Sequence, residues 1–283
     1  MEPLITIAIP TRNRPIFLQQ SLESVLNQTY KSLRVLIIDN NSETDMLPVV
    51  NKFNDRRVSF VKNSENLRII GNWNKAIELC RTKYLSIFHD DDIMLPQFIS
   101  KSIDVLENNP TVGFSYSHAN KVDENLNYIS LWSSLFPGEG FIKGTDYILY
   151  TIKQGCCVTI APTVVVRKNV FDSVGKFGDN LCFNSFDFNM WLRIANKFDV
   201  YFINEVLVNY RVHEGQMSKT YWRSHRKAKG RLATMFELQG AIFLLLDRKD
   251  ITTDKKRVDF LNTKLKENNK LAAHYARMLV DNL

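Results

Sequence analysis

Short apolar runs alternate with longer amphipathic stretches through the first 115 residues of the chain. The runs are rich in β-branched residues, which indicates strands buried on both faces, and the longer stretches repeat apolar residues at helical spacing. The predicted strands are Ile5–Ile9, Leu33–Ile38, Val58–Val61, Tyr84–Phe88 and Val112–Tyr116, and the predicted helices are 16–26, 71–81 and 96–108. This alternation predicts an α/β fold with a mostly parallel, Rossmann-like central sheet and helices on both faces.

The end of the chain has a different pattern. From residue 221 onward there is no proline, and apolar residues recur at helical spacing, which predicts two or three helices. The chain of 283 residues is longer than one average domain. We expect one domain over residues 1–218, made of the halves 1–117 and 118–218, and a basic C-terminal helical extension over 219–283.

Composition narrows the class of protein. The chain is 45% hydrophobic and 24% charged, which excludes wholesale disorder, and no run of about 18 apolar residues predicts a membrane span. The first residues lack the pattern of a secretory signal, and the four cysteines do not have the spacing of a zinc or redox site. These features predict a cytoplasmic protein.

The net charge of +7 is concentrated in the predicted extension. Residues 219–283 hold 15 Lys and Arg against 7 Asp and Glu, whereas residues 1–218 hold 22 against 23. A solvated helix face explains such a charge, and so does attraction to an anionic membrane surface or an acidic partner. Because no nucleic-acid-binding motif accompanies the basic residues, no nucleic-acid partner is expected.

Polar residues follow three of the predicted strands. These segments are Pro10–Arg14, Asp39–Ser42 and His89–Asp92. Ligands bind at the carboxyl ends of strands in such sheets, so we expect the chemistry there. Neither of the Gly-rich phosphate-binding motifs, G-x-G-x-x-G or G-x-x-x-x-G-K-[ST], is present, so a nucleotide must be held in another way.

The sharpest signal is the run of three carboxylates Asp90, Asp91 and Asp92. Neighbouring carboxylates at a buried strand end repel one another unless a cation lies among them. Oxygen ligands without thiolates suit Mn²⁺ or Mg²⁺, which often complete their coordination with substrate phosphates. The alternative is that these residues cap the helix that begins near Pro96.

Seven motifs in order resemble the family 2 glycosyltransferases with the GT-A fold. They are Ile9–Arg14, Ser24–Tyr30, Val35–Ser42, Glu65–Asn74, Tyr84–Asp92, Val174–Arg193 (as Val174–Phe177 and Asp187–Arg193) and Tyr210–His213. The resemblance covers roughly residues 4–218. It implies that 1–117 is the nucleotide-sugar-binding half and 118–218 the acceptor half.

The resemblance also implies roles for residues of the first half. Thr11 and Asp39 match the positions that hold the nucleobase, where a carboxylate accepts a hydrogen bond from uracil or thymine. The alternative for Asp39 is a helix N-cap or an Asx turn. Family members often have Tyr where this chain has Arg12, and many have Gly where it has Arg68. The complete predicted nucleotide-sugar site is Pro10, Thr11, Arg12, Asn13, Asp39, Arg68, Asn74 and Asp90.

By the same resemblance, Asp91 is the principal metal ligand, with Asp90 and Asp92 beside it, and His89 replaces a carboxylate seen in many members. Asp187 matches the general base, which takes the proton of the acceptor hydroxyl during a single inverting displacement. Its alternative is a helix N-cap.

Two further residues are predicted to contact the donor or the acceptor. His213 follows Tyr210, Arg211 and Val212 and is otherwise a polar loop residue, and Trp132 lies in a segment, 130–140, predicted to be a mobile loop. Trp73 and Trp191, at helical positions, are predicted to be core.

The resulting prediction is a metal-dependent, inverting glycosyltransferase that uses a UDP- or dTDP-sugar. The acceptor is a hydroxyl of a glycan or a lipid-linked glycan in bacterial surface polysaccharide synthesis. Peripheral association with the inner face of the membrane through the basic helices and a homo-oligomer are both left open. The alternatives are a sugar nucleotidyltransferase and a catalytically inactive carbohydrate-binding or scaffold protein.

Overall fold

The computed structural model describes residues 3–133, 136, 138, 140–178, 186–216 and 225–280, and in the C-terminal helices it describes the side chains of 231–277. The strands are β1 (Ile5–Thr11), β2 (Leu33–Asp39), β3 (Val58–Lys62), β4 (Tyr84–Ile87), β5 (Ile93–Met94), β6 (Val112–Val122), β7 (Tyr128–Trp132), β8 (Gly140–Ile142), β9 (Val165–Arg167) and β10 (Asp199–Arg211). The helices are α1 (Pro15–Leu26), α2 (Leu47–Asn51), α3 (Arg68–Leu79), α4 (Phe98–Asn108), α5 (Gly144–Gln154), α6 (Val170–Val174), α7 (Phe186–Ala195), α9 (His225–Leu246), α10 (Lys249–Thr252) and α11 (Lys255–Val280), with a 3₁₀ turn at Ala161–Thr163.

All described strands belong to one sheet whose central order is β3-β2-β1-β4-β9-β6-β10-β5. Strands β3, β2, β1 and β4 are mutually parallel, as the alternation of strands and helices predicts. Strand β9 is antiparallel to both β4 and β6, and β6 is parallel to β10. Because β9 is antiparallel to both of its neighbours, β6 and the adjacent β10 run in the same direction as β4. This shared direction brings the end of β10 to the edge where β1, β2 and β4 end.

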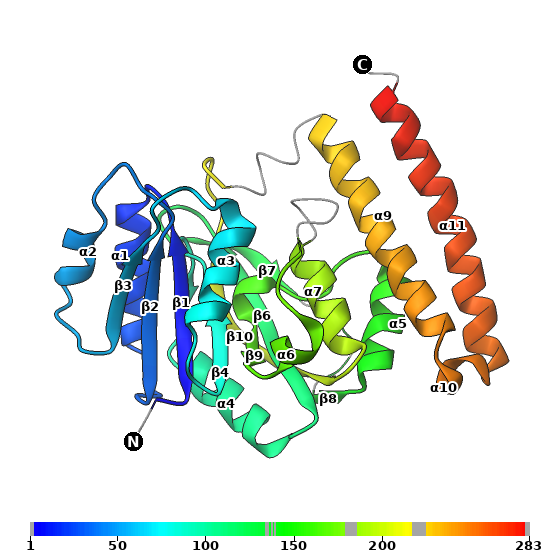
Figure 1. Ribbon diagram of the computed structural model, residues 1–283, viewed down its shortest axis with the longest axis horizontal. Coiled ribbons are helices and arrows are strands. Elements are labelled where there is room, and N and C mark those ends of the chain that lie inside the picture. Colours follow the sequence, from blue (N-terminus) through cyan, green and yellow to red (C-terminus); the bar gives the residue numbers. More distant parts are fainter. Residues whose placement is uncertain are drawn as a thin grey trace.

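Both faces of the sheet are buried, which explains the continuous apolar runs. Along β1, Ile5, Ile7 and Ile9 join the apolar core that α1 and α4 cover, while Ala8 joins the core that α3 covers. Successive side chains of a strand point to opposite faces, so a run without polar interruptions is needed when helices cover both. The predicted mostly parallel sheet with two helical layers is confirmed (Figure 1).

Two local predictions need correction. Helix α3 begins at Arg68 instead of Gly71, and Arg68 has a left-handed backbone with φ of 57°. Apolar spacing does not reveal this start, because the backbone conformation of Arg68 has no counterpart in the spacing of Ile69 and Ile70. Trp132 lies at the end of strand β7 and not in a loop, since β7 pairs with β6. Residues 134, 135, 137 and 139 of the predicted mobile loop lie outside the described residues.

The predicted C-terminal helices are present as α9, α10 and α11, and α9 and α11 lie side by side as an antiparallel pair (Figure 1). Buried residues of α9, among them Leu238 and Ile242, join the core that includes α5 and α7. A hydrogen bond of 2.6 Å from Asn189 Nδ2 to Glu237 Oε2 fastens α9 to α7. The boundary predicted at residue 218 lies outside the described residues and stays a prediction.

Within the described part of the chain, no helix combines the length and the apolar composition needed to cross a bilayer.

Candidate active site

The ends of β1, β4 and β10 meet in one cluster of hydrogen bonds. Thr11, the last residue of β1, donates from Oγ1 to Asp90 Oδ2 over 2.7 Å. Arg211, the last residue of β10, donates from its backbone N to Asp92 Oδ1 over 2.8 Å. These contacts join segments that are 79 and 119 residues apart in the sequence, and they follow from the shared direction of the three strands.

Asp91 accepts hydrogen bonds from two cationic or polar side chains on a single oxygen, Oδ2. His213 Nε2 lies 3.0 Å from Asp91 Oδ2, and since an ionised carboxylate only accepts, this nitrogen carries the hydrogen. The His213 ring is buried and packs against Phe17 with ring centroids 4.8 Å apart. Arg14 Nη1 donates to the same Asp91 oxygen over 2.7 Å. The structure therefore places His213, predicted to contact the donor, directly on the acidic cluster.

The three neighbouring acids have different proton affinities. Burial, followed by the charge of Asp91, raises the pKa of Asp90 to about 6. Burial likewise raises the pKa of Asp92 to about 6, although His89 acts against it. For Asp91 burial also acts upward, but the His213 hydrogen bond and the charges of His89 and Arg14 outweigh it, and the pKa is lowered. Asp91 is thus the ionised centre of the cluster.

A divalent cation fits one part of this cluster. One ligand atom each from His89, Asp91 and Asp92 lies within 4.8 Å of the others. Asp92 Oδ2 is buried without a hydrogen-bond partner among the described residues, although His89 Nδ1 lies 3.1 Å away. A buried carboxylate oxygen without a donor is costly, and a cation would satisfy it. Two carboxylates with one imidazole suit Mn²⁺ better than Mg²⁺, which favours oxygen ligands.

This group of candidate metal ligands differs from the predicted ligands in one residue. Asp90 is engaged by Thr11 and Arg14, and His89 stands with Asp91 and Asp92 instead. In the sequence, His89 stands out only as a departure from the family pattern. Its position three residues before Asp92, at a strand end, was the available signal. The predicted role of Asp90 as a ligand stays a prediction.

The predicted nucleobase site lies at the ends of β1 and β2. Asp39 Oδ1 accepts hydrogen bonds from the backbone N of Ser42 (2.9 Å) and from its hydroxyl, so this oxygen stabilises the turn that follows β2. Asp39 Oδ2 is buried and lacks a hydrogen-bond partner among the described residues; Lys62 Nζ lies 3.8 Å away. One oxygen of this carboxylate therefore stabilises the turn, and the other has no hydrogen bond from the described residues.

Asn13 connects these two strand ends. Its backbone N donates to Ser42 Oγ over 2.9 Å, and its Oδ1 accepts from the backbone N of Glu43 over 2.8 Å. Asn13 has a positive φ of 56°, which Asn tolerates better than most residues. The adjacent Arg12 side chain is 43% exposed and pairs with Glu43 at 3.6 Å. Pro10 lies between the buried strand and this turn, so Pro10, Thr11, Arg12 and Asn13 all lie at the predicted edge.

Arg68 reaches the same edge from α3. Its carbonyl accepts a hydrogen bond of 3.2 Å from Asn40 Nδ2, and its backbone N donates to Asn66 Oδ1 over 2.9 Å. A left-handed backbone at a residue with a Cβ costs about 1–2 kcal/mol. Such strain is concentrated at functional sites. It also accounts for the glycine that many family members have at this position.

Asn74 has a different environment from the one expected. Its Nδ2 donates to the carbonyl of Phe177 over 2.9 Å, and its Oδ1 accepts from the backbone N of Phe177 over 2.9 Å. This reciprocal pair fastens α3 to the segment that precedes residues 179–185, which lie outside the described residues. The pair gives Asn74 a structural role, and its contact with a donor stays a prediction.

Asp187, the predicted base, is the second residue of α7. Its Oδ1 accepts from the backbone N of Phe188 over 2.8 Å, and its side chain is half-buried. Burial raises the pKa of Asp187, while the Phe188 amide and the charge of His89 act in the opposite direction. A base with a raised pKa is better matched to proton abstraction near neutral pH.

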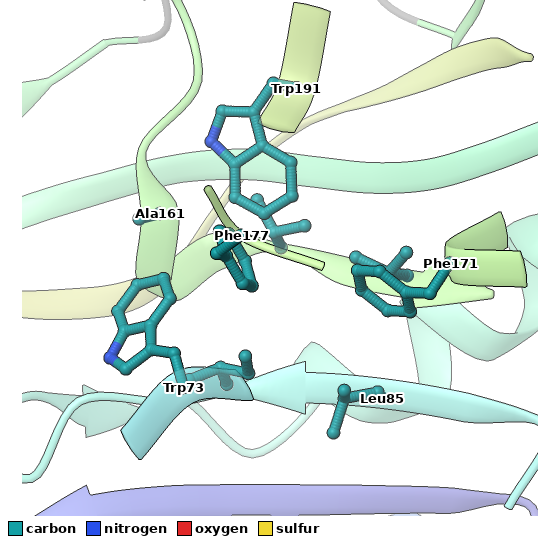
Figure 2. A pocket seen from close by; sticks show the side chains of 9 residues that line it. Trp73, Leu85, Ala161, Phe171, Phe177 and Trp191 are labelled. Atoms are coloured by element: carbon teal, nitrogen blue, oxygen red, sulfur yellow. The ribbon is translucent and has the colours of Figure 1, made fainter. Parts of the chain in front are cut away.

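An aromatic cluster links Asp187 to the acids. Trp73 of α3 contacts the His89 ring at 5.7 Å and the Phe186 ring at 5.0 Å between centroids. Trp73 and Trp191 also line a small apolar cavity together with Phe177, with the two indoles on opposite sides of the phenyl ring (Figure 2). Both tryptophans are buried, as predicted. This packing holds the start of α7 next to the strand-end cluster.

Trp132 is half-buried and in contact with protein groups. Its ring meets Tyr210 edge-on at 4.7 Å, and Lys121 Nζ lies 4.8 Å from the ring centroid. Tyr210 immediately precedes Arg211, so Trp132 lies beside the end of β10. Its predicted contact with a sugar stays a prediction.

Two arginines at the site were missed as functional residues. Arg211 is buried, its guanidinium lies 4.7 Å over the Phe17 ring, and its Nε and Nη2 have no hydrogen-bond partner in the described part of the chain. Arg14 bonds to two of the acids. Pro15 was a signal for Arg14, because Pro favours the first position of a helix and so places Arg14 at the strand-to-helix junction.

The sequence matches the model of glycosyl transferase family 2 over residues 6–175. An uncharacterized glycosyltransferase of Methanocaldococcus jannaschii is 30% identical over 216 residues, which are 75% of this chain and 71% of the relative. The Escherichia coli UDP-Glc:alpha-D-GlcNAc-diphosphoundecaprenol beta-1,3-glucosyltransferase WfaP is 28% identical over 217 residues, 76% of this chain and 80% of that protein.

Solved structures share the fold. Residues 1–349 of S. aureus TarS in complex with UDP-GlcNAc align with a TM-score of 0.68 at 13% identity, covering 98% of this chain and 72% of that one. The mannosyltransferase PcManGT of Pyrobaculum calidifontis, in complex with GDP-Man and Mn²⁺, aligns with a TM-score of 0.60 at 13% identity, covering 99% of this chain and 86% of that one. The expected GT-A architecture is thereby confirmed.

Proposed function

Because the chain belongs to glycosyltransferase family 2 and is a nucleotide-sugar-dependent glycosyltransferase, we propose that it is a metal-dependent, inverting enzyme. The observation that carries the proposal is the grouping of His89, Asp91 and Asp92 at the sheet edge that also holds Asp39. A cation at this site can bind the diphosphate of a nucleotide-sugar donor. The Asp39 oxygen that has no hydrogen bond from the described residues can accept one from the nucleobase.

We assign the following roles to the residues of the site. Asp39 accepts a hydrogen bond from the base through Oδ2, Thr11 and Asp90 bind the nucleoside, and His89, Asp91 and Asp92 hold a divalent cation. When bound, this cation neutralises the charge that develops on the departing nucleoside diphosphate. Asp187 removes the proton of the acceptor hydroxyl while that oxygen attacks the anomeric carbon from the face opposite the diphosphate. A single displacement inverts the anomeric configuration.

We favour a UDP- or dTDP-sugar as donor. Asp39 can accept from the N3–H that uracil and thymine share, and its Oδ2 is free of hydrogen bonds from the described residues. The name of the E. coli relative specifies UDP-Glc, and S. aureus TarS binds UDP-GlcNAc. PcManGT binds GDP-Man, so the fold alone does not decide the base.

The proposed acceptor is a hydroxyl of a glycan or a lipid-linked glycan in bacterial surface polysaccharide synthesis. The E. coli relative supports this choice because its named acceptor is a diphosphoundecaprenol-linked sugar. Lys266, Lys270 and Arg277 are exposed along one stripe of α11. This stripe supports the further proposal that the basic helices bind the anionic inner face of the membrane.

A donor screen tests the proposed function. Purified protein is mixed with a panel of UDP-, dTDP- and GDP-sugars, with and without Mn²⁺, and its melting temperature and the released products are measured. We expect a donor-specific rise in melting temperature and release of nucleoside diphosphate, both abolished by EDTA. Release of pyrophosphate would instead identify a nucleotidyltransferase, and absence of turnover with every donor and acceptor would favour a binding or scaffold protein.

A further inference from the structure

Arg14 occupies the centre of the acidic cluster. Its Nη1 donates to Asp91 Oδ2 over 2.7 Å and lies 3.2 Å from Asp90 Oδ1. Its Nη2 donates to the carbonyl of Gly215 over 2.8 Å. One guanidinium therefore bridges two strand-end carboxylates and the segment that follows β10, which is 201 residues away in the sequence.

The bond from Arg14 falls on one of the candidate cation ligands. Asp91 Oδ2 accepts from both Arg14 and His213, while Asp91 also belongs to the group with His89 and Asp92. A divalent cation held by Asp91 would lie close to the guanidinium charge. Like charges repel strongly at such separations in a partly buried site. A cation and Arg14 thus compete for the same carboxylate.

The bonded side chain of Arg14 reaches the protein surface, whereas its backbone is fixed at the start of α1. The Arg14 side chain is 29% exposed, in contrast to 4% for the other Asp91 partner, His213. The Arg14 carbonyl accepts from the backbone N of Leu18 over 2.9 Å at the start of α1. Rotation of the long side chain toward solvent is therefore sufficient to release Asp91, with no change in α1.

From this geometry we propose that Arg14 is the counter-charge of the metal-free site and that it leaves Asp91 when a divalent cation binds. The inference rests on the proposed metal dependence. Because the same guanidinium holds the Gly215 carbonyl, its departure also breaks a bond to the segment after β10. Arg14 is thus a positioning residue that couples cation binding to the contact between the acidic cluster and the segment after β10.

Calorimetric titration with Mn²⁺ alone, without nucleotide, tests the proposal. Arg14→Gln removes the competing charge, and we expect it to bind Mn²⁺ at least fivefold more tightly than the unsubstituted protein. Without metal, its melting temperature is expected to be lower, because Asp91 loses a partner. Arg14→Lys keeps the charge on a shorter side chain that has no second nitrogen for the Gly215 carbonyl, and an intermediate affinity is expected. This variant also tests the proposal if the glutamine variant does not fold.

Arg12→Gln is the matched control. It removes the same charge two residues away, from an exposed side chain that pairs with Glu43, and its Mn²⁺ affinity is expected to stay within twofold. Equal or weaker Mn²⁺ binding by Arg14→Gln, with the unsubstituted protein binding normally, would overturn the role of Arg14 and leave the metal dependence intact. Absence of Mn²⁺ binding in every variant, with and without nucleotide, would overturn the cation site itself.

Discussion

The strand-end acids and the basic helix α11 are both concentrations of like charge, but the fold treats them in opposite ways. The side chains of Asp90 and Asp91 are 8% and 10% exposed, and each is bonded by side chains from other segments. On α11, Lys266 and Lys270 are exposed to solvent. Burial makes like charges costly, so they persist where bonding compensates or function requires them. Exposed charges contribute little to the free energy of folding, so retaining or replacing them has a small effect.

The difference predicts that substitutions in the acidic region have large effects and those on α11 small ones. The largest expected effect is that of Asp187→Asn, next to the acids. Loss of the base should lower transfer at least about 10²-fold, while donor affinity stays within twofold. The measurements are the transfer rate at saturating donor and the calorimetric donor Kd. Asp172→Asn, an exposed Asp in the first turn of α6, is the control.

An unchanged transfer rate in Asp187→Asn would remove this residue from the mechanism. An equal loss of donor binding would indicate structural damage at the start of α7.

Asp91→Asn comes next in size. It retains the shape of the side chain but removes the ionised centre of the cluster, so donor affinity in Mn²⁺ should fall at least tenfold. Without Mn²⁺ the two proteins should bind donor alike. Calorimetry with and without the metal checks this, and Asp104→Asn on the exposed side of α4 is the control. If the donor affinity of Asp91→Asn in Mn²⁺ matches that of the unsubstituted protein, Asp91 is not a ligand.

A smaller effect is expected from pH on the stability of the metal-free protein. The folded state raises the pKa of Asp90 and Asp92 to about 6, so it holds their protons more tightly than the unfolded chain does. The resulting stabilisation is fully present below the unfolded value near 4 and is lost as pH rises through about 6. A rise in pKa from near 4 to about 6 corresponds to about 3 kcal/mol for one carboxyl.

The melting temperature should therefore fall by several degrees between pH 5 and pH 7.5. The raised pKa of His89 acts in the same direction, because its stabilisation is also lost with rising pH. Asp91, with a lowered pKa, loses stabilisation only below about pH 4, outside this window. Calorimetric scans of the protein and of Asp92→Asn test the assignment. An equally steep fall in the variant would show that other groups cause it.

The smallest expected effect is on the basic helix. Lys270→Gln should weaken binding to vesicles that contain anionic phospholipid about fivefold, since one basic residue near such a surface is worth about 1 kcal/mol. Transfer to a soluble acceptor should not change. Lys31→Gln, an exposed lysine in the N-terminal half, is the control in a vesicle co-sedimentation assay. Equal binding by both variants would argue against α11 as a membrane-binding surface.

Much of the fold could be predicted because its signals are local. β-Branched runs such as Leu33–Ile38 and the amphipathic helices between them depend on spacing within a dozen residues. The acids after β4 were visible for the same reason, since a strand and the residues after it are adjacent in the chain. The family resemblance then supplied Asp187, to which no local pattern assigns the role of a base.

The partners of these acids could not be predicted from spacing. Strand β9 is antiparallel to both β4 and β6, and β6 is parallel to β10, so β10 runs in the same direction as β4. His213 and Arg211 therefore reach Asp91 and Asp92. Strand pairing between residues as far apart in the sequence as Tyr84 and Arg167 leaves no trace in local periodicity. Pro15 places Arg14 at the strand-to-helix junction, but neither Pro15 nor the apolar spacing shows that the Arg14 side chain bonds to Asp90 and Asp91 while Arg12 pairs with Glu43.

The left-handed backbone at Arg68 has a consequence for protein engineering. Glycine adopts this conformation without steric penalty, so a redesign guided by thermal stability alone would choose Gly at position 68 early. The same exchange would delete a cationic side chain from the edge proposed to bind the nucleotide. Under the proposed role of Arg68, thermal stability and donor binding therefore place opposite demands on this one position.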